Sequence, residues 1–125
     1  MADVVIIEDS QYQRGVLKWM LNKHGYSVHE AADGKIGLEL VATVRPDCIT
    51  IDIAMPVMDG LGGLKALQEI GDDTPKIIMS ADIQKSTHDI CIGLGADVVL
   101  TKPPREDELI QTIKRLVSER SLATP

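Results

Sequence analysis

The chain has 125 residues, which is enough for one domain with a hydrophobic core and too few for two ordinary domains. Hydrophobic residues make up 44% and charged residues 26%, a balance typical of globular proteins, and the absence of Phe predicts an aliphatic core. The formal net charge of −6 argues against a general nucleic-acid-binding protein, because such proteins carry basic surfaces.

The sequence contains no sign of a membrane or secretion signal. No apolar segment approaches the roughly 20 residues needed to cross a bilayer. The start, MADVVIIEDS, lacks the basic region of a signal peptide and turns acidic where the cleavage site would lie. Cys48 and Cys91 have no metal-like spacing, so we expect two buried thiols in a reducing compartment. We therefore expect a cytoplasmic protein with no membrane partner and no direct contact with nucleic acid.

Short apolar runs alternate with segments of helical period along the chain. The first run, residues 4–7, precedes a helix in which Ser10 and Gln13 have capping-box spacing. Gly25 ends this helix, and Trp19 fits its core-facing pattern. The apolar stripe of the helix consists of Val16, Leu17, Met20 and Leu21.

The next predicted elements are a strand, a helix and a second strand. A weak strand over residues 26–31 precedes a helix that Asp33 can cap and Pro46 ends. We expect the inner side of this helix to carry Ile36, Leu40, Val41 and Val44. Residues 48–52 form the third strand of the chain.

The second half of the chain repeats this alternation. A helix closed by Gly71 is expected to turn inward Leu61, Leu64, Leu67 and Ile70. Residues 76–80 form the fourth strand, and the helix after it is expected to turn inward Ile83, Thr87, Ile90 and Leu94. Residues 98–100 form the fifth strand. A last helix over residues 105–120 is expected to pack through Leu109, Ile113, Leu116 and Val117.

Strands joined by helices predict a parallel sheet that is covered on both faces. The near-continuous apolar strands, such as residues 76–79, fit burial on both faces. The expected fold class is therefore α/β, a doubly wound five-stranded parallel sheet with five helices. In such folds ligands bind at the carboxyl ends of the strands.

Chemically active side chains follow the predicted strands at their carboxyl ends. They are Glu8 and Asp9 after the first strand, Asp52 after the third, Ser80 after the fourth, and Thr101 and Lys102 after the fifth. The strand ends of a parallel sheet share one edge, so these side chains converge. Two carboxylates about 4 Å apart repel by about 4 kcal/mol at an effective dielectric near 20, so such a cluster takes up a proton or binds a cation.

Oxygen ligands without His or thiolate favour Mg²⁺, which keeps water molecules for a phosphate. Lys102 adds a compact positive charge, and Ser80 can donate a hydrogen bond to a phosphoryl oxygen. The group suits phosphoryl transfer, in which positioning and charge neutralisation supply most of the catalysis. Asp52 is then either a metal ligand or a nucleophile that forms an aspartyl phosphate.

Four motifs, each after a predicted strand, resemble the receiver domains of two-component response regulators, the CheY-like family. They are Glu8-Asp9, the segment Asp52-Ile-Ala-Met-Pro-Val-Met-Asp-Gly60, Ser80-Ala81 and Lys102-Pro103. Each motif is weak alone, but all four in this order are highly specific. The resemblance covers essentially the whole chain and implies a flavodoxin/CheY-like fold with strand order 2-1-3-4-5, a receiver domain over residues 1–121 and a frayed tail over residues 122–125.

The resemblance implies a role for each motif. Asp52 would accept a phosphoryl group from the phosphohistidine of a sensor histidine kinase or phosphotransfer protein. The implied Mg²⁺ ligands are Glu8 (through water), Asp9, Asp52 and the main-chain carbonyl of Ala54. The implied phosphoryl contacts and switch residues are Ser80, Ala81 and Lys102, and the peptide bond before Pro103 would be cis.

The resemblance also implies an output mechanism. Movement of Ser80 toward the phosphoryl group would reshape the face formed by the fourth helix, fifth strand and fifth helix. A downstream protein target would bind that face, and phosphorylation-dependent homodimers are also found in the family.

Several positions depart from the family pattern. The first acid is Glu8 where many relatives have Asp, and the hydroxyl is Ser80 where Thr is commoner. Val99 stands where many receivers carry Tyr or Phe, so we hypothesise that the signal passes through the backbone after Ser80 without an aromatic rotamer change. Ala54 and Asp82 give opposing indications about the lifetime of the phosphate.

Two other function classes fit parts of the pattern. A Mg²⁺-dependent phosphatase of the haloacid dehalogenase type would use Asp52 as nucleophile, but it needs a second Asp where this chain has Ala54. A flavodoxin-like electron carrier needs a phosphate-binding loop after the first strand, where Glu8 and Asp9 would repel a flavin phosphate. The sequence therefore favours a phosphoacceptor regulator, which catalyses only its own phosphorylation and dephosphorylation.

Overall fold

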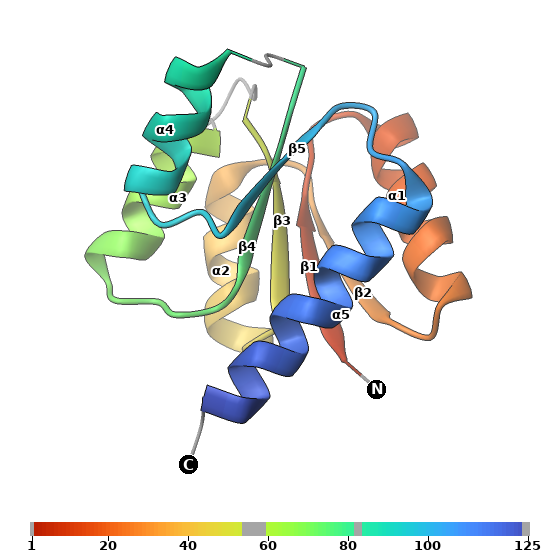
Figure 1. Ribbon diagram of the computed structural model, residues 1–125. Helices are drawn as coiled ribbons and strands as arrows, with labels where there is room; N and C mark the ends of the chain where they lie inside the picture. Colours follow the sequence, from red (N-terminus) through yellow and green to blue (C-terminus); the bar gives the residue numbers. More distant parts are fainter. Residues whose placement is uncertain (1, 54–59, 82–83, 124–125) are drawn as a thin grey trace.

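The computed structural model describes residues 2–53, 60–81 and 84–123. Within these residues, five parallel strands form one sheet in the order β2-β1-β3-β4-β5 (Figure 1). The strands are β1 (Asp3–Ile7), β2 (Ser27–Ala31), β3 (Cys48–Asp52), β4 (Lys76–Ser80) and β5 (Val98–Thr101). This order confirms the predicted doubly wound sheet. Its topological switch point lies between β1 and β3, where ligands bind in such folds.

Helices cover both faces of the sheet (Figure 1). One face carries α1 (Gln11–Lys23) and α5 (Glu106–Ala123), and the other carries α2 (Gly34–Val44), α3 (Gly60–Glu69) and α4 (Lys85–Gly93). A hydrophobic core lies on each face of the sheet, and alternate residues of β1 point into one or the other. Val4 and Ile6 pack with α1 and α5, whereas Val5 and Ile7 pack with the other helices. The strands are therefore buried on both sides, as their continuous apolar sequences predict.

Several predicted helix boundaries are confirmed by the capping geometry. Ser10 Oγ accepts a hydrogen bond from the Gln13 amide at 3.2 Å, and Asp33 Oδ1 accepts one from the Ile36 amide at 2.8 Å. Gly25 and Gly71 follow α1 and α3 with φ of +87° and +74°, in the left-handed region that favours glycine. Polar side-chain caps thus determine where α1 and α2 begin, and glycines determine where α1 and α3 end.

Four predicted core positions on the helices are wrong. Trp19 is 61% exposed and Ile70 is 73% exposed, and Ile36 and Ile90 are exposed as well. In α4 the buried position is Cys91, the residue next to Ile90, whereas Thr87 is half-buried and Leu94 packs against the core as predicted. Ile83, also predicted to point inward, lies outside the described residues.

The packing of α2 explains why apolar periodicity failed there. Its buried residues are Gly34 and Gly37, which the pattern did not indicate, together with Val41, which was predicted. A Cβ atom at Gly37 would overlap Cδ1 and Cγ1 of Ile7. Glycine therefore lets α2 approach β1 closely, and Ile36 is displaced toward solvent.

The C-terminal helix is longer than predicted. The helix α5 continues to Ala123, three residues beyond the predicted end, so residues 122 and 123, expected in a frayed tail, are helical. Acidic residues occupy its first turn, and Arg120 lies in its last turn, an arrangement that the helix dipole favours.

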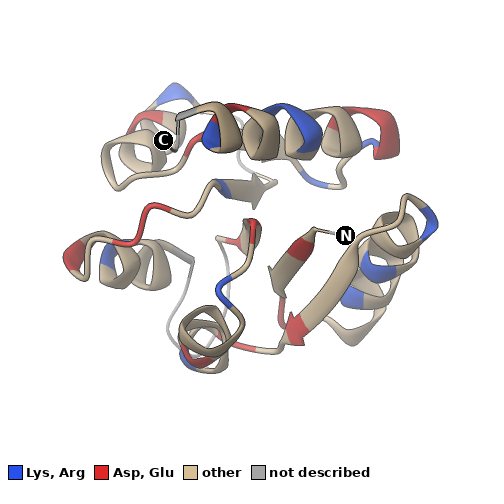
Figure 2. Ribbon diagram, turned by 90° about the horizontal axis from the view of Figure 1, so that it is seen from below, with Lys and Arg blue, Asp and Glu red and all other residues tan. Residues whose placement is uncertain are grey.

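Paired charges hold the amino-terminal edge of the sheet, which Figure 2 views with acidic segments in red and basic segments in blue. The Asp3 amide donates to Asp47 Oδ2 at 2.8 Å, and the Lys76 amide donates to Asp97 Oδ2 at 2.9 Å. The buried ammonium of Lys76 lies 2.9 Å from Asp72 Oδ2. Acids at this edge are therefore satisfied by main-chain or ammonium donors.

Candidate functional site

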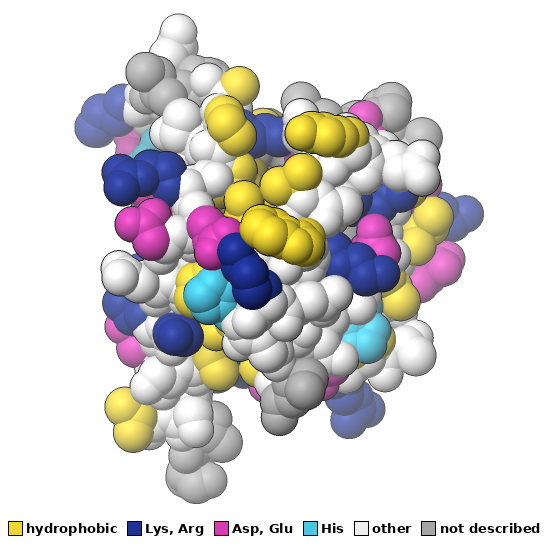
Figure 3. Space-filling model, turned by 90° about the vertical axis from the view of Figure 1, so that its right-hand side faces the viewer, with side chains coloured by type: hydrophobic (Ala, Val, Ile, Leu, Met, Phe, Trp, Pro, Cys, Tyr) yellow, Lys and Arg dark blue, Asp and Glu magenta, His cyan; other side chains and the backbone are white. Residues whose placement is uncertain are grey.

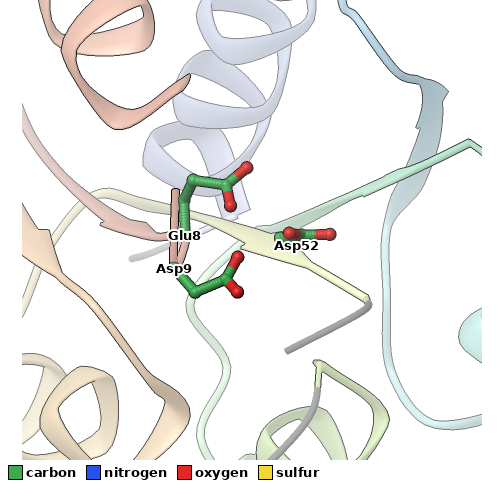
Figure 4. A group of neighbouring side chains, drawn as sticks. All are labelled: Glu8, Asp9 and Asp52. Carbon is green, nitrogen blue, oxygen red and sulfur yellow. The ribbon is translucent and has the colours of Figure 1, made fainter. Parts of the chain in front are cut away.

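Three carboxylates meet at the carboxyl-terminal edge of the sheet, where β1 and β3 end (Figure 4). Ile7 pairs with Ile51 across the two strands, so Glu8 and Asp52 follow on neighbouring strands. Oxygen atoms of Glu8, Asp9 and Asp52 all lie within 4.8 Å of one another. Glu8 is 2% exposed and Asp52 is 4% exposed, whereas Asp9 faces solvent. The switch point therefore holds two buried acids and one accessible acid.

Lys102 is the ammonium group that the structure brings to these acids. Its Nζ atom lies 3.0 Å from Glu8 Oε1 and 3.0 Å from Asp52 Oδ2. The Lys102 amide donates to the Ser80 carbonyl at 2.8 Å, which ties the end of β5 to the end of β4. One ammonium faces three carboxylates in this cluster, so the site retains negative charge that a cation would neutralise.

Burial and neighbouring charges shift the pKa values of two of these groups. Burial is the main reason that the pKa of Glu8 rises to about 7; contact with Asp52 also raises it, while the Ser10 amide and Lys102 lower it. For Lys102, burial lowers the pKa, but hydrogen bonds to Asp52 and Glu8 outweigh burial and raise it. Glu8 therefore takes up a proton near neutral pH when no cation is bound.

The donor set fits Mg²⁺. The cluster offers carboxylate oxygens and no imidazole or thiolate, which is the chemistry of hard cations. Mg²⁺ takes few protein ligands and keeps several waters, and the exposure of Asp9 leaves an open side for them. The residues present can therefore hold the cation that the sequence suggested.

The remaining predicted site residues have different surroundings. Ser80 is buried at the end of β4, and Ala81 beside it is exposed. Val99 is half-buried and packs against the core under α2, α3 and α4. The Lys102–Pro103 peptide bond is cis, the isomer that the resemblance implies. Two positions, Ala54 and Asp82, lie outside the described residues.

An apolar groove beside the acids was missed by sequence reasoning. It has a volume of about 560 Å³, includes Glu8 and Lys102, and is lined by apolar side chains of α1 and the segment before α5. These apolar side chains include Val16, Leu17, Met20, Pro103 and Pro104. Figure 3 shows a band of hydrophobic side chains across this face of the molecule. Tyr12, Val16 and Trp19 recur at helical spacing on α1, but this signal resembles that of a core-facing stripe.

Comparison with known proteins identifies the family. Residues 4–114 match the response regulator receiver domain family. This chain belongs to that family. The receiver domain of Francisella response regulator 1452 superposes with a TM-score of 0.92 at 32% identity, covering 96% of this chain and 99% of that one. The chemotaxis protein CheY4 of Vibrio cholerae superposes with a TM-score of 0.86 at 30% identity, covering 93% and 98% of the two chains.

This receiver domain is also similar to longer proteins. Response regulator MprA of Mycolicibacterium vanbaalenii is 34% identical over 91% of this chain and 49% of its own length. For MprA of Mycobacterium leprae the identity is 36%, over 91% and 50% of the two chains. The chain therefore spans about half the length of the curated relatives that it matches.

Membership of this family confirms the predicted CheY-like fold and the general function. A receiver domain is a phosphoacceptor regulator in two-component signal transduction rather than an enzyme with a separate substrate, and it implies a cognate histidine kinase. The cluster of Glu8, Asp9 and Asp52 is consistent with the phosphoacceptor site of such a switch. Among the described residues, we find no helix with the length and hydropathy of a membrane span.

Proposed function

We propose that Asp52 is the phosphoacceptor of this receiver domain and that a sensor histidine kinase or phosphotransfer protein supplies the phosphoryl group from a phosphohistidine. The observation that carries the proposal is the convergence of Glu8, Asp9 and Asp52 with Lys102 at the switch point of the sheet. No single strand provides this set of groups, and together they supply a nucleophile, cation ligands and a positive charge.

The reaction transfers the phosphoryl group from nitrogen to oxygen. A carboxylate oxygen of Asp52 forms the new bond to phosphorus while the bond from phosphorus to the imidazole nitrogen breaks. The electron pair of that bond stays on the imidazole, which takes a proton from water. Lys102 already lies 3.0 Å from Asp52 Oδ2, so its ammonium is placed to contact the incoming phosphoryl oxygens.

The cation would be held by residues of the same edge. Glu8 (through water), Asp9, Asp52 and the carbonyl of Ala54 are the proposed Mg²⁺ ligands, and Ala54 lies outside the described residues. Bound Mg²⁺ supplies neutralisation of charge on the phosphoryl oxygens. Ser80, at the end of the adjacent strand, is the proposed hydroxyl donor to the phosphoryl group, with Ala81 next to it.

The apolar groove supports a protein as phosphodonor. A partner that delivers a histidine to Asp52 must cover the surface next to Glu8 and Lys102, and this surface is the groove between α1 and the segment before α5. Tyr12 and Trp19 are exposed aromatic residues of the same helix, the residue type that is enriched at protein interfaces. The proposed location of the domain, beside such a donor protein, is the cytoplasm.

The proposed output face is formed by α4, β5 and α5. Movement of the segment after Ser80 would alter this face and so change binding of a downstream target or a second phosphorylated copy. Ile90 is 53% exposed on α4 and offers apolar surface for such a contact. Because Val99 has no aromatic ring to rotate, the account predicts that phosphorylated and free structures differ in the backbone after residue 80 and little around Val99.

Acetyl phosphate with Mg²⁺ and intact-mass measurement tests the proposal. The wild type should gain one phosphoryl adduct, which EDTA prevents and which Asp52→Asn lacks. The matched control is Asp89→Asn, which removes an exposed acid of α4 and should phosphorylate like the wild type. Steady release of phosphate from varied monoesters without a trapped adduct would instead support a phosphatase.

A further inference from the structure

Arg14 of α1 contacts the main chain of the acidic pair. Its Nη1 atom donates to the Glu8 carbonyl at 2.9 Å and to the Asp9 carbonyl at 3.4 Å. The Arg14 side chain is only 17% exposed, so the guanidinium is largely enclosed by these neighbours. Both hydrogen bonds act on the connection between β1 and α1, the segment that carries two of the three clustered carboxylates.

The guanidinium is itself anchored to the edge strand of the sheet. Arg14 Nε lies 3.3 Å from Glu30 Oε1 on β2, and the other oxygen of Glu30 lies 3.2 Å from Lys18 Nζ. The Glu8 amide donates to the Ala31 carbonyl at 3.0 Å, so β2 supports the same connection from the main chain. Arg14 thus joins α1, the end of β1 and β2 through one planar group.

The direction of a main-chain carbonyl is coupled to the direction of the side chain on the same residue. A donor that holds the Glu8 and Asp9 carbonyls therefore restricts where the two carboxylates point. Groups that orient the ligands of a metal are known to contribute strongly to its affinity. A planar guanidinium holds two acceptors in a defined geometry, which the single ammonium of lysine does not.

We propose that Arg14 is a positioning residue for the cation site: it orients Glu8 and Asp9 for Mg²⁺ by holding their main-chain carbonyls against β2. This inference rests on the proposed function only in taking Mg²⁺ as the cation. Arg14 does not touch the reacting atoms in this role. It acts through the two acids and should affect cation binding rather than the transfer step.

The sign of the effect separates positioning from simple electrostatics. The positive charge of Arg14 repels a cation, so its charge alone predicts that removal of Arg14 tightens Mg²⁺ binding. Positioning predicts the opposite result, because a mobile acidic pair must be ordered when the cation binds. The two effects therefore oppose each other in one measurement.

Calorimetric titration of Mg²⁺ into the phosphate-free protein is the test. Arg14→Met should raise the dissociation constant about tenfold, the lower end of the range for groups that orient metal ligands. Arg14→Lys keeps the charge but loses the planar fork, so it should also weaken binding. Lys18→Met is the matched control, because it removes the other partner of Glu30 and should leave the constant within about twofold.

The rate of phosphorylation by acetyl phosphate gives a second, independent measure of Mg²⁺ affinity. In Arg14→Met the Mg²⁺ concentration for half-maximal rate should rise by the same factor as the dissociation constant, while the rate at saturating Mg²⁺ stays near that of the wild type. A merely structural defect would lower the saturated rate as well. If Arg14→Met does not fold, Arg14→Lys carries the same comparison.

Two results would overturn the inference in distinguishable ways. Unchanged or tighter Mg²⁺ binding in both Arg14 variants, with normal binding in the wild type, would overturn the positioning role alone. Absence of Mg²⁺ binding by the wild type would overturn the proposed cation site and the positioning role together.

Discussion

The two edges of the sheet use the same kinds of side chain for different purposes. At the amino-terminal edge, Asp47 and Asp97 accept hydrogen bonds from main-chain amides, and buried Lys76 is paired with Asp72. At the carboxyl-terminal edge, three carboxylates lie close together, and Lys102 pairs with two of them, Glu8 and Asp52. The first arrangement satisfies its charges and stabilises the fold. The second leaves negative charge unbalanced, which suits a cation and is consistent with the phosphoacceptor site of a receiver domain.

At the amino-terminal edge, replacement of Lys76 should cause the largest change in the free energy of unfolding. Its ammonium donates to the carbonyls of Asp72 and Thr74 and pairs with the Asp72 carboxylate. Lys76→Met should lower the free energy of unfolding by about 3 kcal/mol, because it leaves these acceptors without their partner. Denaturant unfolding measures this change. Lys85→Met, which breaks an exposed pair with Asp89, should have no measurable effect, and equal effects of the two variants would contradict the comparison.

The pH dependence of stability tests the carboxyl-terminal edge. The pKa of Glu8 is raised from 4.5 to about 7 in the folded protein, so the folded state binds a proton that the unfolded state releases. Without divalent cations, the stability from Glu8 is fully present below its unfolded pKa and is lost as pH rises through about 7. The loss should reach about 3 kcal/mol. Urea titrations at several pH values should show this decline in the wild type and a flatter profile in Glu8→Gln; identical profiles would contradict the assignment to Glu8.

Added Mg²⁺ should stabilise the protein through the carboxyl-terminal edge alone. At a concentration tenfold above its dissociation constant, a cation that binds only the folded state stabilises it by about 1.4 kcal/mol. Thermal unfolding should show this gain in the wild type and in the less stable Lys76→Met. Asp9→Asn should lose most of the gain because it removes the accessible acid. An equal gain in Asp9→Asn would place the cation elsewhere.

Thr50 lies in β3, between the two edges. Its replacement should cause the smallest change in the free energy of unfolding. Its hydroxyl is the one buried polar side-chain atom among the described residues that has no hydrogen-bond partner. Thr50→Val removes this group at nearly constant volume and should raise the free energy of unfolding by about 1 kcal/mol. Thr50→Ser keeps the hydroxyl and loses a methyl group, so it should destabilise the protein. A destabilising Thr50→Val would show that the hydroxyl is satisfied.

The carboxyl-terminal edge could be predicted from sequence because it depends only on order along the chain. Once the strands are known to be parallel, Glu8, Asp52 and Lys102 must come to one edge, whatever the details of packing. Ser10 and Asp33 were also predictable as caps, since a cap acts on an amide three residues away.

The helix faces were harder to predict because several apolar patterns fit one helix. In α2 the close approach to Ile7 requires Gly37, and this contact between distant residues has no signal in local periodicity. Trp19 fits a core-facing apolar pattern in the sequence of α1. In the structure, however, its side chain is exposed, and Lys23 Nζ lies 3.8 Å from its ring centroid. The role of Arg14 also depends on tertiary contacts, because its partner Glu30 lies on another strand.

The location of a bound cation tests the central claim most directly. Mn²⁺ accepts the same carboxylate ligands as Mg²⁺, and its anomalous scattering identifies it in crystals. The account predicts an anomalous peak in contact with Asp9 and Asp52 at the carboxyl-terminal edge and none at the amino-terminal edge. A peak beside Asp72 or Asp97, with none at the carboxyl-terminal cluster, would contradict it.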